Sequence, residues 1–93
     1  MGIRGNYKNK RDANEKIIFA ILRSYGIQVE PTDEPLDAIC AYKGVNYLVE
    51  VKDGPKARYT PKQKEFMDRW QGQYVVLRSE QEAFTWAQEI TGH

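Results

Sequence analysis

The segment from Leu36 to Lys52 constrains the fold most, because it has the pattern of two β-strands joined by a turn. Its second half, Tyr47–Lys52, is rich in β-branched and aromatic residues, which favour strands. Its first half, Leu36–Tyr42, also has the pattern of a strand, and the intervening residues 43–46 include a turn glycine, Gly44. This segment therefore predicts a β-hairpin.

The residues before the hairpin predict one helix and one strand. A helix is expected from about Asp12 to Gly26, because apolar residues recur along it and glycine is a common residue at helix ends. Residues 27–30 alternate between apolar and polar and predict a short strand. Residues 1–11 show no apolar periodicity and are interpreted as a flexible basic arm, which leaves a single domain over residues 12–93.

The residues after the hairpin predict two helices with a strand between them. Thr60 is placed to cap a helix, with Pro61 at its first position and Gln63 closing a capping box. This helix is expected to reach about residue 70, followed by a buried strand over residues 74–77. Ser79 and Glu82 form a second capping-box pattern that begins the last helix.

The predicted order is helix, strand, strand, strand, helix, strand, helix. Three consecutive strands followed by a helical crossover imply a mixed four-stranded sheet. Helices on both faces would complete a three-layer α/β domain.

Composition excludes several kinds of chemistry. The 93-residue chain contains one cysteine, Cys40, and one histidine, His93, so it has no disulfide framework and no zinc site of its own. Chemistry must depend on carboxylates, lysine and backbone groups. No apolar run approaches the ~18–20 residues of a membrane span, and no apolar signal stretch opens the chain. We therefore expect an intracellular protein with no membrane partner.

Charge is segregated along the chain, although the net charge is only +1. Residues 1–24 and 51–78 are basic, with six basic against two acidic and seven against three acidic side chains. Residues 25–50 and 79–93 are acidic. One interpretation is an unremarkable patchy surface. The other is a basic surface for phosphate beside an acidic pocket for a cation.

Two charged residues interrupt the strongest strand. Glu50 and Lys52 are two apart and share one face, whereas Val49 and Val51 share the other. They are explained either by an exposed edge strand with an ion pair or by a functional site. Asp37 begins the preceding strand near the same end, so it is expected to lie beside Glu50. Two carboxylates that close repel each other unless a cation lies between them.

Glu15 and Gln63 each introduce a polar residue at the end of an apolar helix stripe. Glu15 shares its stripe with Ile18 and Leu22. The helix dipole is one explanation for Glu15, and the capping box is one for Gln63. The alternative is that both belong to a site with the strand residues.

Together these positions predict a Mg²⁺ or Mn²⁺ site at which phosphate is hydrolysed. The expected metal ligands are Asp37, Glu50 and the carbonyl of Val51, and Glu15 would bind a second cation directly or through water. Such a cation polarises a phosphate and lowers the pKa of a bound water. Lys52 would hold or activate that water and stabilise negative charge in the transition state, and Gln63 would orient Lys52 or a metal-bound water.

These residues resemble the PD-(D/E)XK nuclease superfamily, whose signature is an acid at one strand start and (D/E)-x-K on the next strand. Within it, the chain looks most like the small stand-alone VRR-NUC nucleases and the archaeal-type Holliday junction resolvases. The resemblance spans about residues 12–90. The residues on which it rests are Glu15, Pro35–Asp37 with Ala38–Ile39, Leu48–Gly54 and Tyr59–Gln63.

The resemblance implies a restriction-endonuclease-like core and metal-dependent hydrolysis of DNA. Without a further domain for base readout, structure-selective cutting is expected, in particular of branched DNA such as Holliday junctions by a homodimer. It also suggests the cytoplasm of a bacterial or phage-infected cell. Eight basic residues are expected to contact phosphates: Arg4, Lys8, Lys10, Arg11, Lys56, Arg58, Lys62 and Lys64.

Two other functions stay open at this point. The first is a DNA-binding module on a nuclease fold that is inactive or needs a partner protein. The second is a small interaction protein unrelated to nucleases. Metal binding and cleavage distinguish all three.

Overall fold

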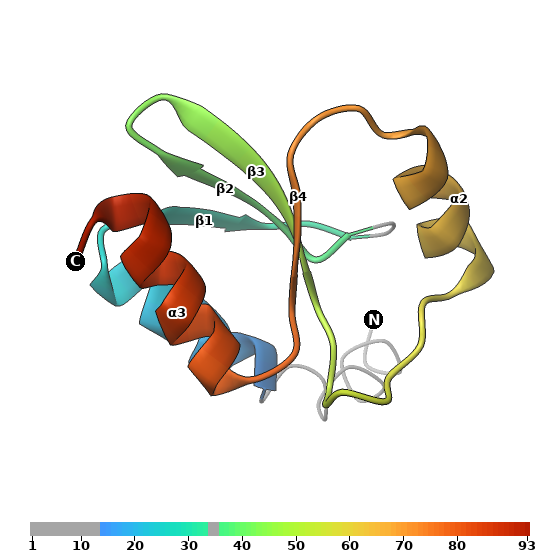
Figure 1. The fold of residues 1–93 in the computed structure, drawn as a ribbon, viewed down its shortest axis with the longest axis horizontal. Coiled ribbons are helices and arrows are strands. Elements are labelled where there is room, and N and C mark those ends of the chain that lie inside the picture. Colours follow the sequence, from blue (N-terminus) through green and yellow to red (C-terminus); the bar gives the residue numbers. More distant parts are fainter. Residues whose placement is uncertain (1–13, 34–35) are drawn as a thin grey trace.

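The structure is a computed structural model, and it describes residues 14–33 and 36–93. In these residues, four strands form one sheet and three helices pack around it (Figure 1). The first helix includes residues 14–24. The other elements are β1 (Gln28–Pro31), β2 (Ala38–Tyr42), β3 (Val45–Val51), α2 (Pro61–Arg69), β4 (Tyr74–Leu77) and α3 (Glu80–Thr91).

The predicted order of helices and strands is confirmed, and the differences lie at strand ends. β1 is displaced by one residue, and β2 begins at Ala38 rather than at Leu36. β3 already begins at Val45, so the predicted four-residue connection narrows to Lys43 and Gly44. Both have positive φ, 49° and 84°, as a two-residue hairpin turn requires to follow the twist of its strands. The start expected near Asp12 and the basic arm over residues 1–11 lie outside the described residues.

The sheet is mixed, as predicted. Its strand order is β1-β2-β3-β4, with antiparallel pairing from β1 to β3 and parallel pairing between β3 and β4. The crossover from β3 to β4 passes through α2. The carboxyl ends of β3 and β4 therefore meet at one edge, and the start of β2 lies there too because Ala38 pairs with Val49.

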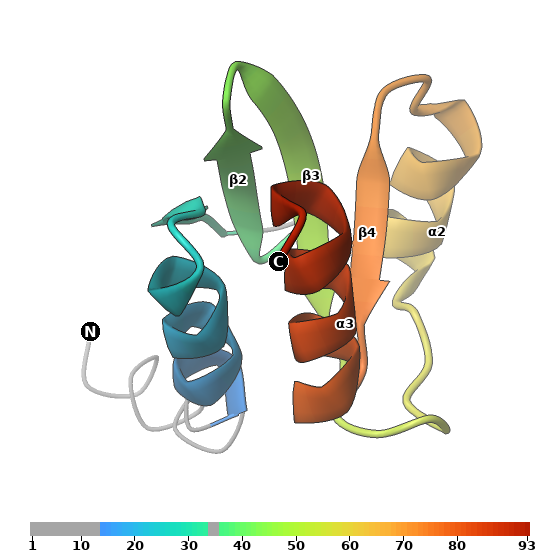
Figure 2. The ribbon, with the colours of Figure 1, turned by 60° about the vertical axis from the view of Figure 1, so that its left-hand side comes forward.

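One face of the sheet is apolar and lies under two helices. The first helix and α3 lie side by side on this face (Figure 2). Ile18 and Leu22 of the first helix are fully buried, as are Ala83 and Ala87 of α3. They pack with strand residues that share the same face: Val29, Ala38, Cys40, Val49, Val51 and Leu77. This core agrees with the predicted stripe of the first helix.

α2 covers the opposite face, which completes the three layers. Its start is as predicted, because Thr60 Oγ1 accepts a hydrogen bond from the Gln63 backbone and the Gln63 side chain accepts one from the Thr60 backbone. The prediction of a second capping box is only half correct. Ser79 caps α3 by accepting a hydrogen bond from the backbone N–H of Glu82. The Glu82 side chain, however, accepts from the N–H of Arg78 and not, as a capping box requires, from that of Ser79.

None of the helices in the described part of the chain is long and apolar enough to cross a membrane.

Candidate functional site

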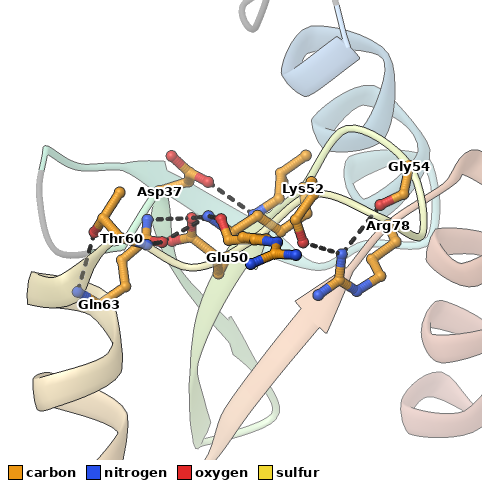
Figure 3. A network of polar contacts seen from close by, with 10 residues as sticks. Asp37, Glu50, Lys52, Gly54, Thr60, Gln63 and Arg78 are labelled. Carbon is orange, nitrogen blue, oxygen red and sulfur yellow. Dashed lines mark hydrogen bonds and ion pairs between the residues drawn. The ribbon is translucent and has the colours of Figure 1, made fainter.

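Three polar or charged residues are buried in the part of the chain that the structure describes, and they contact one another. They are Glu50, Lys52 and Gln63, with exposed fractions of 0%, 8% and 7%. Glu50 and Lys52 lie at the end of β3 and just after it, and Gln63 lies in the first turn of α2 (Figure 3). This excludes the interpretation of Glu50 and Lys52 as an exposed edge, since burying charge requires a compensating network.

Gln63 joins the two charges. Its Nε2 donates to Glu50 Oε2 at 2.5 Å, and its Oε1 accepts from Lys52 Nζ at 2.6 Å. The same Oε1 accepts from the backbone N–H of Thr60 at 3.0 Å. Glutamine suits this position because one side chain offers a donor to the carboxylate and an acceptor to the ammonium. The capping box and the site are therefore one structure, and the two explanations of Gln63 are compatible.

The Lys52 ammonium is held by three oxygen acceptors. Besides Gln63, Nζ donates to the carbonyl of Arg58 at 3.1 Å and lies 3.3 Å from Glu50 Oε2. It also lies 5.3 Å from the ring centroid of Tyr59, within the range of a cation–π contact. Two of the three acceptors are neutral carbonyl groups, so the ammonium is fixed in place while its charge is balanced by one carboxylate only.

Asp37 lies just before β2, near the end of β3 that holds Glu50. Ala38, the first residue of β2, pairs in the antiparallel ladder with Val49, the residue before Glu50. Asp37 also extends that ladder, because its N–H donates to Val49 and its Oδ2 accepts from the N–H of Val51 at 2.7 Å. These contacts hold Asp37 at the end of β3 where Glu50 and Lys52 lie, and a direct relation between the two carboxylates stays a prediction.

The oxygen atoms of these side chains suit a cation that prefers oxygen ligands and keeps bound water. Asp37 and Glu50 supply carboxylate oxygens at one end of the sheet, beside the Lys52 ammonium. Mg²⁺ is commonly held by one or two carboxylates and several waters. No group of three histidine, cysteine, aspartate or glutamate side chains suited to a metal occurs in residues 14–33 and 36–93. Glu15, half-buried on the first helix, is therefore not placed in such a group, and its role stays a prediction.

The predicted phosphate-binding residues fall into two groups. Lys56, Arg58 and Lys64 line one cavity of about 440 Å³ next to Lys52, whereas Lys62 is exposed on α2 and does not line it. Four others lie outside the described residues: Arg4, Lys8, Lys10 and Arg11.

Arg78 is a site residue that the sequence analysis missed. Arg78 directly follows β4, and Lys52 directly follows β3. Because the last residues of these strands, Leu77 and Val51, are paired, the two basic residues leave the sheet side by side. Arg78 Nη1 donates to the carbonyls of Gly54 at 3.0 Å and Ala57 at 2.8 Å (Figure 3). The signal was available, since a basic residue follows each of the two strands expected to be parallel.

Tyr74 was also missed. Its hydroxyl is buried and makes no hydrogen bond within the described residues. Burial raises its pKa to about 12, and negative charge on Glu50, Tyr59 and Asp37 acts in the same direction. Tyr74 lies on β4 opposite Leu48, on the face that Glu50 and Lys52 share.

No family model matches the chain, and neither the curated proteins nor the solved structures contain a significant match. The function is therefore inferred from the residues and their geometry.

Proposed function

We propose that this protein is a metal-dependent deoxyribonuclease of the PD-(D/E)XK kind, with a restriction-endonuclease-like core. The observation that carries the proposal is the buried network of Glu50, Lys52 and Gln63 beside Asp37. The four residues come from three separated segments and meet at the carboxyl ends of two parallel strands. Ligand sites of open α/β sheets lie at such ends.

The energetics of the network favour a functional role. A buried ion pair adds little net stability, because removing two charges from water offsets most of their attraction. Apolar residues of similar size would hold the sheet against α2 as well or better. The network is therefore better explained by chemistry than by folding.

Each residue has a defined task in the proposed reaction. Asp37, Glu50 and the Val51 carbonyl would hold Mg²⁺ or Mn²⁺, which acts as a Lewis acid toward the phosphate. The Lys52 ammonium stabilises the negative charge that develops on phosphate oxygens. Gln63 and the Arg58 carbonyl position this ammonium, so its orientation is set before substrate arrives.

The proposed substrate is branched or otherwise structured DNA, such as a Holliday junction. Symmetric cutting of a four-way junction requires two active sites, hence a homodimer with twofold symmetry. Exposed apolar side chains are available for such contacts on several elements, and they include Ile17, Ile39, Val45, Trp70 and Phe84.

The proposal is tested by cleavage of a labelled four-way junction and of a linear duplex with the same sequence, in Mg²⁺ or Mn²⁺. Paired symmetric nicks near the crossover would support a dimeric resolvase. Cleavage of the duplex alone would retain the nuclease and reject junction selectivity. Binding without cleavage of either DNA would favour a DNA-binding module on a nuclease fold.

A further inference from the structure

A basic cavity adjoins the proposed active site but takes no part in the reaction described above. Its volume is about 440 Å³, and its walls come from the loop after β3, from α2 and from the residue that follows β4. Among the residues that the structure describes, four basic side chains line it and no acidic one does. These are Lys56, Arg58, Lys64 and Arg78, and the ring of Tyr59 lies among them.

The loop that forms this cavity is held in place by Arg78. Its Nη1 donates to three carbonyls of the loop, those of Gly54, Pro55 and Ala57, and the backbone carbonyl of Arg78 accepts from the N–H of Gly54 at 3.3 Å. The guanidinium lies 5.6 Å from the ring centroid of Tyr59. The cavity is thus fixed by contacts within the protein, and binding a ligand there would not require the loop to be ordered first.

Arg78 keeps donors available for a ligand. A guanidinium has five N–H donors, and the carbonyl contacts use Nη1 alone. Within the described residues, Nε and Nη2 donate to no acceptor. Four like charges around one cavity repel one another. An anion with several oxygen atoms would relieve this repulsion and accept hydrogen bonds from these N–H groups.

The cavity and the active site share a wall. Lys52 Nζ donates to the carbonyl of Arg58, whose neighbour Tyr59 contacts both Lys52 and Arg78. A strand with one phosphate at Lys52 would therefore carry its neighbouring phosphate toward the cavity.

We propose that this cavity binds the phosphate group adjacent to the one that is cleaved, so that the substrate must be a polynucleotide strand and not a single phosphate ester. This inference rests on the proposed nuclease function and adds Arg78 and Tyr59 to the site.

The test is binding of a labelled DNA oligonucleotide to the full chain in EDTA, where cleavage does not occur. We compare Arg58→Gln and Lys64→Gln with Lys16→Gln, a matched loss of charge at an exposed position of the first helix. Each cavity variant should bind DNA several-fold more weakly. The association constant should also fall less steeply with salt, so that the slope of log K against log salt becomes less negative by about 0.7–0.9. Lys16→Gln should leave both quantities unchanged.

Equal losses for Lys64→Gln and Lys16→Gln, or no loss in either cavity variant, would overturn the inference. The binding assay is independent of catalysis, so the two proposals fail separately. If the protein never cleaves DNA but the cavity variants still weaken binding, the nuclease proposal fails, and the cavity stands as a DNA phosphate site but not as the neighbour of a cleaved phosphate. If it cleaves DNA and the variants bind normally, only the phosphate site fails.

Discussion

The two faces of the sheet are built in opposite ways from alternate residues of the same strand. Val49 and Val51 of β3 enter an apolar core under the first helix and α3. Glu50 and Lys52 are buried equally well on the other face, but among polar partners of α2 and the following loop. Burial of the first pair stabilises the fold by removing apolar area from water. Burial of the second pair costs solvation free energy that the network only offsets.

If the proposed function is correct, the apolar face holds the fold and the α2 face performs the chemistry. Changes on the apolar face should reduce stability with little effect on activity. Changes on the α2 face should reduce activity more than stability.

The largest effect is expected for Lys52→Ala. Loss of one preorganised charge-stabilising donor should lower metal-dependent DNA cleavage about 100- to 1,000-fold, whereas DNA binding in EDTA is retained. The assay is cleavage of labelled DNA by the folded variant, with Lys16→Ala as the control for loss of a lysine. Cleavage equal to that of the unaltered chain would reject the assigned role.

The apolar face is tested by Leu22→Ala. Leu22 is fully buried, so the substitution should lower the free energy of unfolding by about 2–5 kcal/mol through lost burial and a cavity. Urea unfolding gives this value, and cleavage by the remaining folded protein should be normal. A loss of cleavage comparable to that of Lys52→Ala would remove the distinction between the faces.

Two helix caps give a finer comparison. Thr60→Ala and Ser79→Ala each remove an N-cap acceptor and should each cost about 1 kcal/mol in unfolding experiments. Only Thr60 is bonded to Gln63, so only Thr60→Ala should also reduce cleavage. Equal activity of the two variants would show that the cap does not position the site.

The smallest effect is expected at alkaline pH. Burial raises the pKa of the Cys40 thiol from 9.0 to about 12, so the unfolded chain loses this proton at lower pH than the native protein does. The associated stability is fully present below about pH 9 and falls as pH rises toward 12, with a loss of about 1 kcal/mol by pH 10. Urea unfolding at pH 7 and pH 10 measures the loss, and Cys40→Ala should reduce it. If Cys40→Ala loses as much stability between pH 7 and pH 10 as the unaltered chain does, the loss belongs to other groups such as Tyr74.

The sequence predicted those parts of the site that depend on local rules. Strand parity placed Glu50 with Lys52, and the cap pattern placed Gln63 at the start of its helix. The antiparallel hairpin then placed Asp37 near the end of β3 that holds Glu50.

Parts that depend on distant contacts were not predicted. The position of Arg78 after its strand can be read from the sequence, but its contacts cannot, because they join it to carbonyls of a loop more than 20 residues earlier in the chain. The Tyr74 hydroxyl is buried by packing between layers, which composition and periodicity do not describe.

The most direct test of the account is a titration of the protein with Mn²⁺, followed by the change in its electron paramagnetic resonance signal. We predict saturable binding that Asp37→Asn weakens at least about tenfold, since this variant removes the charge of one of the two carboxylates while keeping the shape of the side chain. A protein that binds no Mn²⁺, or a variant that binds it as tightly as the unaltered chain does, would contradict the claim that the polar face is built around a cation.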